Sequence, residues 1–288
     1  MSEIFDIYLL EAVLNGLLLG GLLALLSLGL NLVFGVIDVV WICYAELIMC
    51  GMYAVYYLYV QYHWPLVLAM LAAIALVALL GWILHQFVIR PVLNAEPINQ
   101  LLVTGGVLFF LQAAATLVFG IEFKNLGVTL PSVRLGEMSF SAARLVAFGA
   151  ALGGVVGLWL FLSRSYLGTA IRAISQDRAI MPLMGVDPGR IFALTSALGG
   201  GLAGLASCLL VLQYDIHPSI GLSFGPITFL ICVLGGLGNM LGGFIAAFIF
   251  AQFIAVGGFF FAVEWGYVIA FIFFIAMMFW RPRGILGK

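Results

Sequence analysis

Charged side chains make up only 8% of this 288-residue chain, and six of them lie between Arg164 and Arg190. Long apolar runs with almost no charge lie on both sides of this stretch, called here the polar island (residues 164–190). In a chain otherwise suited to lipid, such an island needs a partner on one side of the membrane. We therefore expect it to be a binding surface.

The polar island is expected to form a short amphipathic cytoplasmic helix. Its apolar residues are Ile171 and Ile174, then Ile180, Leu183 and Met184, and its polar side is supplied by Arg172, Gln176, Asp177 and Arg178. Gly185 and the turn at 187–189 are expected to end this helix. Two apolar faces on one short helix are costly in water unless one face docks on a partner. A plain cytoplasmic loop of similar length is the alternative.

Glu46 is the one acid well placed for chemistry at membrane depth, because it lies at the start of an apolar segment. Transport coupled to protons or sodium normally needs buried acids there. The carboxylate could serve as such a coupling site, or it could be an acid stabilised by a helix N-terminus. The breaks at 35–45 and 235–239 are suggestive too, since interrupted helices expose backbone groups where they line a cavity or are protected by protein.

Several other kinds of chemistry have no support in the sequence. Lys124 and Lys288, the two lysines, lie in no GxxxxGK[ST] phosphate loop, so nucleotide chemistry would need another subunit. The three histidines, His63, His85 and His217, are expected at the membrane interfaces, and neither they nor the four cysteines have metal-ligand spacing. The net charge of −1 offers no basic surface for nucleic acid. We expect neither an enzyme, a metal site nor a nucleic-acid partner.

The composition indicates an integral membrane protein. Hydrophobic residues make up 65% of the chain, whereas soluble proteins carry roughly 25% charged residues to cover their surface. Residues 216–263 contain no Asp, Glu, Lys or Arg, which is more than the roughly 20 residues of one membrane-spanning helix. Barrel-type alternation is missing, so we expect an all-α polytopic transmembrane helix bundle in contact with membrane lipid.

Nine apolar segments are separated by breaks that hold nearly all the charge. They lie at 9–34, 41–60, 65–88, 98–119, 143–162, 191–213, 218–237, 239–257 and 263–280. Basic residues favour the cytoplasmic side, so Arg90, the polar island and Arg281 place the N-terminus outside. The segment 218–257 either crosses twice or forms a re-entrant pair, which gives about eight spans or half-spans with broken helices. Glycines four residues apart, such as Gly149 and Gly153 or Gly200 and Gly204, predict close helix packing.

Four stretches are informative when taken together: NGLLLGGLLALLSLGLNLVFGVID at 15–38, IRAISQDRAIMPLMGVDPGRIFALTSALGGGLAGLAS at 171–207, GGLGNMLGGFIAA at 235–247 and RPRGILG at 281–287. Their order resembles one known family, the inner-membrane permease subunits of branched-chain amino acid ABC importers. The resemblance covers nearly the whole chain. It implies a single permease domain over residues 1–288 that moves branched-chain or other hydrophobic amino acids, or similar small carboxylates, across the bacterial inner membrane.

The resemblance also implies partners and roles. An importer of this family combines two related permeases, two cytoplasmic ATPases that hold ATP and magnesium, and a periplasmic solute-binding protein. The polar island would be the coupling helix that docks on the ATPase, through Arg172, Gln176, Asp177, Arg178, Met184 and Gly185. The glycines Gly235, Gly236 and Gly238 are similar to a family motif near the translocation path.

The start of the second span departs from the family pattern. The family usually has a segment of the type Asn-Phe-Ala-His-Gly-Glu, and this chain has Trp41-Ile42-Cys43-Tyr44-Ala45-Glu46, which keeps only the Glu. If Trp41, Tyr44 and Glu46 line the substrate pathway, the cargo could be more apolar or aromatic than leucine. If they only pack between helices, the change says little. The rival functions are an ion-coupled secondary transporter, a passive channel for a small neutral solute such as urea, and a structural subunit.

Overall fold

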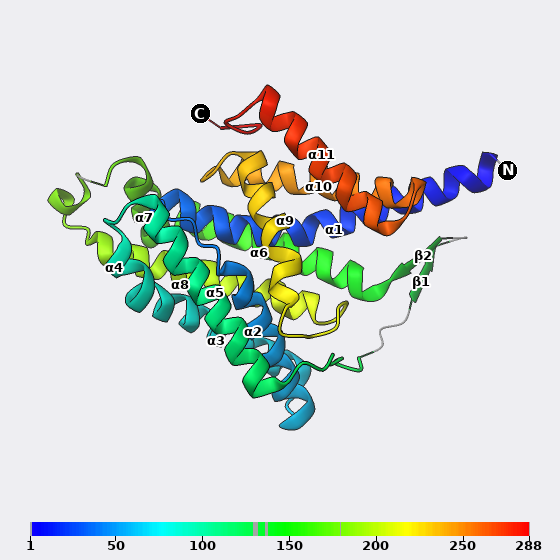
Figure 1. Ribbon diagram of the computed structural model, residues 1–288, viewed down its shortest axis with the longest axis horizontal. Helices are drawn as coiled ribbons and strands as arrows, with labels where there is room; N and C mark the ends of the chain where they lie inside the picture. The colour runs from blue at the N-terminus through cyan, green and yellow to red at the C-terminus, as the bar shows by residue number, and fades with distance from the viewer. Residues whose placement is uncertain (1, 129–131, 136–137, 179, 288) are drawn as a thin grey trace.

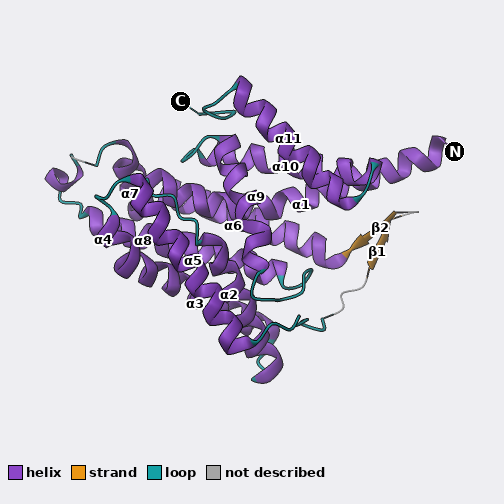
Figure 2. Cartoon of the chain, viewed as in Figure 1, coloured by secondary structure: helices purple, strands orange, loops and turns teal. Residues whose placement is uncertain are grey.

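Helices account for most of the residues that the computed structural model describes, which are 2–128, 132–135, 138–178 and 180–287 (Figure 2). Their bounds are α1 Ser2–Ile37, α2 Tyr44–Tyr56, α3 Leu66–Leu84, α4 Arg90–Val92, α5 Pro97–Phe119, α6 Ala142–Arg164, α7 Tyr166–Gln176, α8 Pro188–Leu210, α9 Ile220–Gly235, α10 Met240–Phe260 and α11 Val263–Trp280. π-helical turns at Tyr57–Gln61 and His85–Ile89 extend α2 and α3. The predicted all-α bundle is confirmed.

Six helical stretches are long and apolar enough to cross a membrane. They are Ile7–Ile37, Leu66–Val92, Pro97–Phe119, Ala142–Arg164, Pro188–Leu210 and Met240–Phe260. Two shorter apolar helices, Ile220–Gly235 and Glu264–Trp280, follow the same composition. The single domain over residues 1–288 stays a prediction.

A short strand pair interrupts the helical pattern and was not predicted. β1 (Ser132–Leu135) and β2 (Met138–Ser141) pair antiparallel, with Ser132 opposite Ser141. Both strands alternate polar and apolar residues in the sequence, which is the pattern of a strand. At four residues each, they are too short to stand out against the long apolar runs.

The basic breaks of the chain lie toward one end of the bundle, and the N-terminus lies toward the other (Figure 1). In Figure 1, α4, α7 and the C-terminus lie toward the left, whereas the N-terminus and the β1–β2 pair lie toward the right. The backbone oxygen of Arg283 also lies close to Gly236, at the turn before α10. The grouping of Arg90, α7 and Arg283 at one side therefore agrees with the predicted topology.

The segment 218–257 forms two helices that run in opposite directions, α9 and α10. α9 ends at a turn where the Ile285 N–H donates to the Leu234 oxygen (2.7 Å), near the C-terminus. α10 then runs back, so that Gln252 and Ala255 reach Gly16 near the start of α1. Since α11 returns to Arg281, the three helices run alternately toward and away from the C-terminus, and whether α9 and α10 both cross the membrane stays a prediction.

α1 is the central helix, and residues 22–33 are almost entirely buried against α6, α8, α9 and α10. The packing of α3 on α8 is also close, because a Cβ at Gly200 would lie 3.2 Å from the Gly81 Cα and one at Gly204 2.9 Å from the Ile74 Cα. The predicted close approach is confirmed for this pair. It is not realised for Gly149 and Gly153, where an added Cβ would meet open space.

The polar island contains a short amphipathic helix, as predicted, but the prediction that this helix continues to Gly185 was wrong. α7 ends at Gln176, and the Asp177 carboxylate accepts a hydrogen bond from the Ile180 N–H (3.2 Å), which closes a turn. A separate 3₁₀ turn spans Met181–Met184 and ends at Gly185, whose φ is 77°. The segment at 187–189 starts α8 instead of ending a helix, because Asp187 Oδ1 accepts from the Gly189 N–H (2.9 Å).

Candidate functional site

The break between α1 and α2 is partly buried: Val39 and Trp41 are covered, whereas Asp38 and Ile42 are exposed. Asp38 ends α1 with a φ of 61°, a left-handed conformation that Asp tolerates better than most residues. The Thr104 hydroxyl of α5 donates to the Val40 oxygen (3.1 Å), which ties the irregular segment to a neighbouring helix. The chain therefore re-enters helix at Tyr44, within protein, as interrupted membrane helices require.

Trp41 and Tyr44 are both buried between α1 and α8. Their rings meet edge to face at 5.9 Å, and the Trp41 Nε1–H donates to Cys43 Sγ (2.8 Å). The Tyr44 hydroxyl lies over Gly29 of α1 and donates to the Gly199 oxygen of α8 (3.4 Å). Since Gly29 is eight residues before the end of α1, Tyr44 lies about 12 Å inside that end.

The same two aromatic rings line an apolar cavity of about 460 Å³ between α1, α2, α5 and α9. Its walls include Leu30, Trp41, Tyr44, Leu108, Pro226 and Phe229. The polar side-chain atoms in the wall already have partners: Trp41 and Tyr44 as described, and the Thr228 hydroxyl through the Phe224 oxygen (2.7 Å). The arrangement can hold a small apolar group out of water. The aromatic residues thus pack between helices and also border a space.

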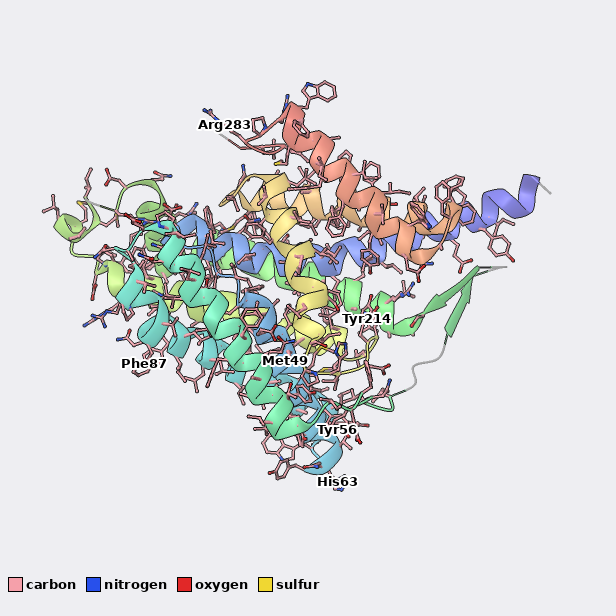
Figure 3. The ribbon with its side chains drawn as sticks, viewed as in Figure 1. Met49, Tyr56, His63, Phe87, Tyr214 and Arg283 are labelled. Carbon is pink, nitrogen blue, oxygen red and sulfur yellow. The ribbon has the colours of Figure 1, made fainter. Side chains whose placement is uncertain are left out.

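Glu46 lies one turn before Met49, which is buried near the middle of the view in Figure 3. Its side chain is 0% exposed, and among the described residues neither carboxylate oxygen has a hydrogen-bond partner. It faces Gly221 in the first turn of α9, where a Cβ would lie 2.6 Å from Oε1.

The predicted glycine turn lies apart from this group. Gly236 and Gly238 have φ values of 97° and 79°, which favour glycine. The Gly238 N–H donates to Asn31 Oδ1 of α1 (3.1 Å), and Gly235 packs against Gly242 of α10. The three glycines therefore close the turn between α9 and α10, and a role in a translocation path stays a prediction.

A hollow of about 760 Å³ brings part of the polar island next to this turn. It is lined by Arg172, Gln176, Asp177 and Arg178, by Asp38 at the end of α1, and by Gly238. The Arg178 guanidinium also lies over the Phe192 ring of α8, 5.6 Å from its centroid. Met184 and Gly185 lie outside the hollow, on the exposed 3₁₀ turn.

A third cavity, of about 500 Å³, lies near the other end and was missed from the sequence. Its polar lining includes Tyr8, Glu11, Asn15, Arg144, Tyr214 and Tyr267. Arg144 Nη1–H donates to Asn15 Oδ1 (2.9 Å). Burial and the neighbouring Tyr267 raise the pKa of Tyr214 above its ordinary value, and Arg144 opposes this shift. The available signal was a charge inside an apolar segment, at Glu11 and at Arg144.

His85 follows the last residue of α3, and its predicted place at a membrane interface stays a prediction. It is buried, and its Nδ1 lies 3.1 Å from the Ser196 hydroxyl of α8. The Ser196 hydroxyl is a hydrogen-bond partner for His85 Nδ1, and lipid could not provide one. Among the described residues, no group of three or more His, Cys, Asp or Glu side chains is arranged to hold a metal ion.

Comparisons with known proteins place this geometry in a family. A family model described as "Branched-chain amino acid transport system / permease component" matches residues 12–278. The high-affinity branched-chain amino acid transport system permease protein BraD of Pseudomonas aeruginosa is 31% identical over 100% of this chain and 98% of its own length. The corresponding LivH protein of Escherichia coli K12 is 30% identical over the same shares.

A solved structure, PsaBC from Streptococcus pneumoniae in complex with Fab, has a TM-score of 0.56 at 11% identity, and the match covers 98% of this chain and 97% of that one. This likeness shows the fold alone. The family match and the full-length relatives go further: with its membrane-spanning helices, the chain is a multi-pass membrane protein that belongs to the family of branched-chain amino acid transport system permease components.

Proposed function

We propose that this chain is the translocation subunit of an ABC importer that moves a branched-chain or similar hydrophobic amino acid inward across a bacterial inner membrane. The observation that carries the proposal is the apolar cavity at the α1–α2 break, which is large enough for an aliphatic side chain. The ion-coupled transporter and the passive channel are not favoured, because the full-length relatives are permeases of transport systems.

The partners are two cytoplasmic ABC ATPases that hold ATP and magnesium, a second related permease and a periplasmic solute-binding protein. The exposed polar island supports the ATPase contact. Leu183 and Met184 are 84% and 73% exposed on the 3₁₀ turn that follows α7 in the chain. Large apolar side chains grouped in a loop outside the spans favour a protein partner that covers them.

The contacts of α7 suggest how this partner acts on the cavity. Ile171 and Ile174 are buried where α7 packs against α1, α6 and α8. The end of α1 leads through Asp38 to Trp41, which borders the cavity. A push on α7 would therefore shift the α1–α2 break and change the balance between outward-open and inward-open packings.

The test uses the assembled importer in proteoliposomes. Changing Leu183→Asp together with Met184→Asp places two charges on the apolar docking surface, so we expect at least a tenfold loss of ATP-driven leucine uptake and loss of the ATPase in a pull-down. Ile121→Asp is the matched control, because Ile121 is 76% exposed in the loop after α5, away from α7. Unchanged coupling in the double variant would contradict the placement of the docking surface.

A further inference from the structure

The carboxylate of Glu46 is the one acidic group buried completely inside the described part of the bundle. No described cation lies within ion-pair distance, and neither oxygen accepts a hydrogen bond from a described residue. A buried charge is normally paired, because water no longer stabilises it. A buried acid that lacks such partners either keeps a proton or pairs with a cationic ligand.

Two helix N-termini meet at this carboxylate. Glu46 lies in the first turn of α2, and Gly221, which it touches, lies in the first turn of α9. The positive ends of both helix dipoles favour the charged form of the acid. They do so without occupying its oxygens, so the carboxylate remains available to a cation.

The apolar cavity lies on the other side of the same turn. Gly221 is part of its wall as well as the contact of Glu46. The wall has no acidic side chain, and its tryptophan, tyrosine and threonine donors already have acceptors. An amino acid with its side chain in this cavity would find no negative group for its ammonium, except beyond Gly221.

Pro226 and Gly225 separate the first turn of α9 from the rest of the helix. Pro226 lies inside α9 and lacks an N–H, so the Leu222 carbonyl has no helical partner there. Gly225 precedes it and removes a further side chain from the wall. Bending at Gly225 and Pro226 would carry Gly221 away from Glu46 while residues 227–235 stay packed.

From these contacts we propose that Glu46 binds the ammonium group of the transported amino acid when the first turn of α9 swings off it, while the side chain occupies the apolar cavity. The inference rests on the proposed function and adds the residue that recognises the cargo as an amine. It makes Glu46 a substrate-binding group and the first turn of α9 its cover.

The experiment measures equilibrium binding of radiolabelled 3-methylbutan-1-amine, which is leucine without its carboxylate, to the purified importer complex, together with ATP-driven leucine uptake. Glu46→Gln keeps the shape and removes the charge, so we expect at least a tenfold loss of amine binding and of uptake. Glu46→Asp keeps the charge on a shorter stem and should retain part of both. Tyr53→Phe is the matched control, since the Tyr53 hydroxyl on α2 is also buried without a described partner. It should stay within twofold of the unchanged complex.

Amine binding by Glu46→Gln within twofold of the unchanged complex, or no amine binding by the unchanged complex, would overturn the assignment. If Glu46→Gln does not assemble, Glu46→Asp decides in its place, and full loss of amine binding in that folded variant counts against a charge pairing. The complex could also bind the amine through Glu46 and yet move no branched-chain amino acid. That result would support the assignment of Glu46 and contradict the proposed function.

Discussion

The buried break around Tyr44 and the exposed turn around Leu183 treat large apolar side chains in opposite ways. Trp41 and Tyr44 pack between α1 and α8 and find their hydrogen-bond acceptors within the chain. Leu183 and Met184 project from a 3₁₀ turn with most of their surface uncovered. The first region is completed by the chain itself, and we infer that the second is completed by another protein. Substitutions in the two regions should therefore fail in different ways.

The largest difference is expected in folding stability. Tyr44→Ala removes a buried ring and leaves a cavity between α1 and α8, so it should lower the free energy of unfolding by about 3–5 kcal/mol. Leu183→Ala, on the exposed turn, should change it by less than about 0.5 kcal/mol. Thermal unfolding of the purified chain in detergent measures both. Equal losses would mean that the two regions are not distinct.

Tyr44→Ala should also change what the folded importer accepts, because the ring borders the apolar cavity. Larger aromatic amino acids should gain uptake relative to leucine, and Tyr44→Phe should keep the original preference. An unchanged preference in folded Tyr44→Ala would mean that the ring only packs between helices.

An intermediate effect is expected in the polar island. Replacing Arg172 and Arg178 with Ala removes two positive charges from the hollow at the end of α1. It also removes the cation–π contact of Arg178 with Phe192, and such a contact stabilises a protein by about 0.5–1 kcal/mol at an exposed site. We expect ATP hydrolysis to continue while leucine uptake per ATP falls severalfold. Paired assays of hydrolysis and uptake test this, and tight coupling in the double variant would argue against a role in transmission.

The smallest effect is expected at the turn after α7. Asp177→Ala removes the acceptor for the Ile180 N–H and should cost about 0.5–1.5 kcal/mol. Asp177→Asn keeps an acceptor oxygen and serves as the control. If hydrogen exchange at Ile180 is the same in Asp177→Ala as in the unchanged chain, this bond does not hold the turn.

The sequence predicted the helical elements well because membrane spans are long and almost uncharged, so each apolar segment marks a helix. The polar island stood out for the opposite reason, since its arginines contrast with their surroundings. Its division into α7 and a 3₁₀ turn was missed. The hydrogen bond of Asp177 and the proline at position 182 break the helix at one point, whereas the apolar periodicity on both sides of that point is typical of one helix.

The site was harder to predict because it depends on contacts between distant segments. Nothing near Glu46 in sequence indicates that Gly221 faces it, and nothing near Tyr44 indicates that Gly29 and Gly199 make room for its ring. The polar cavity at Arg144 and Tyr214 also joins residues from α1, α6 and α11 that have no common spacing. Such positions follow from helix packing, which a single sequence specifies only weakly.

The location of the cargo tests this account most directly. A cryo-electron microscopy structure of the assembled importer, trapped with leucine inside, should show the aliphatic side chain between Trp41, Tyr44 and Phe229 and the ammonium at Glu46. Leucine bound instead at the polar cavity beside Arg144, with the apolar cavity closed and Glu46 still covered by Gly221, would contradict it.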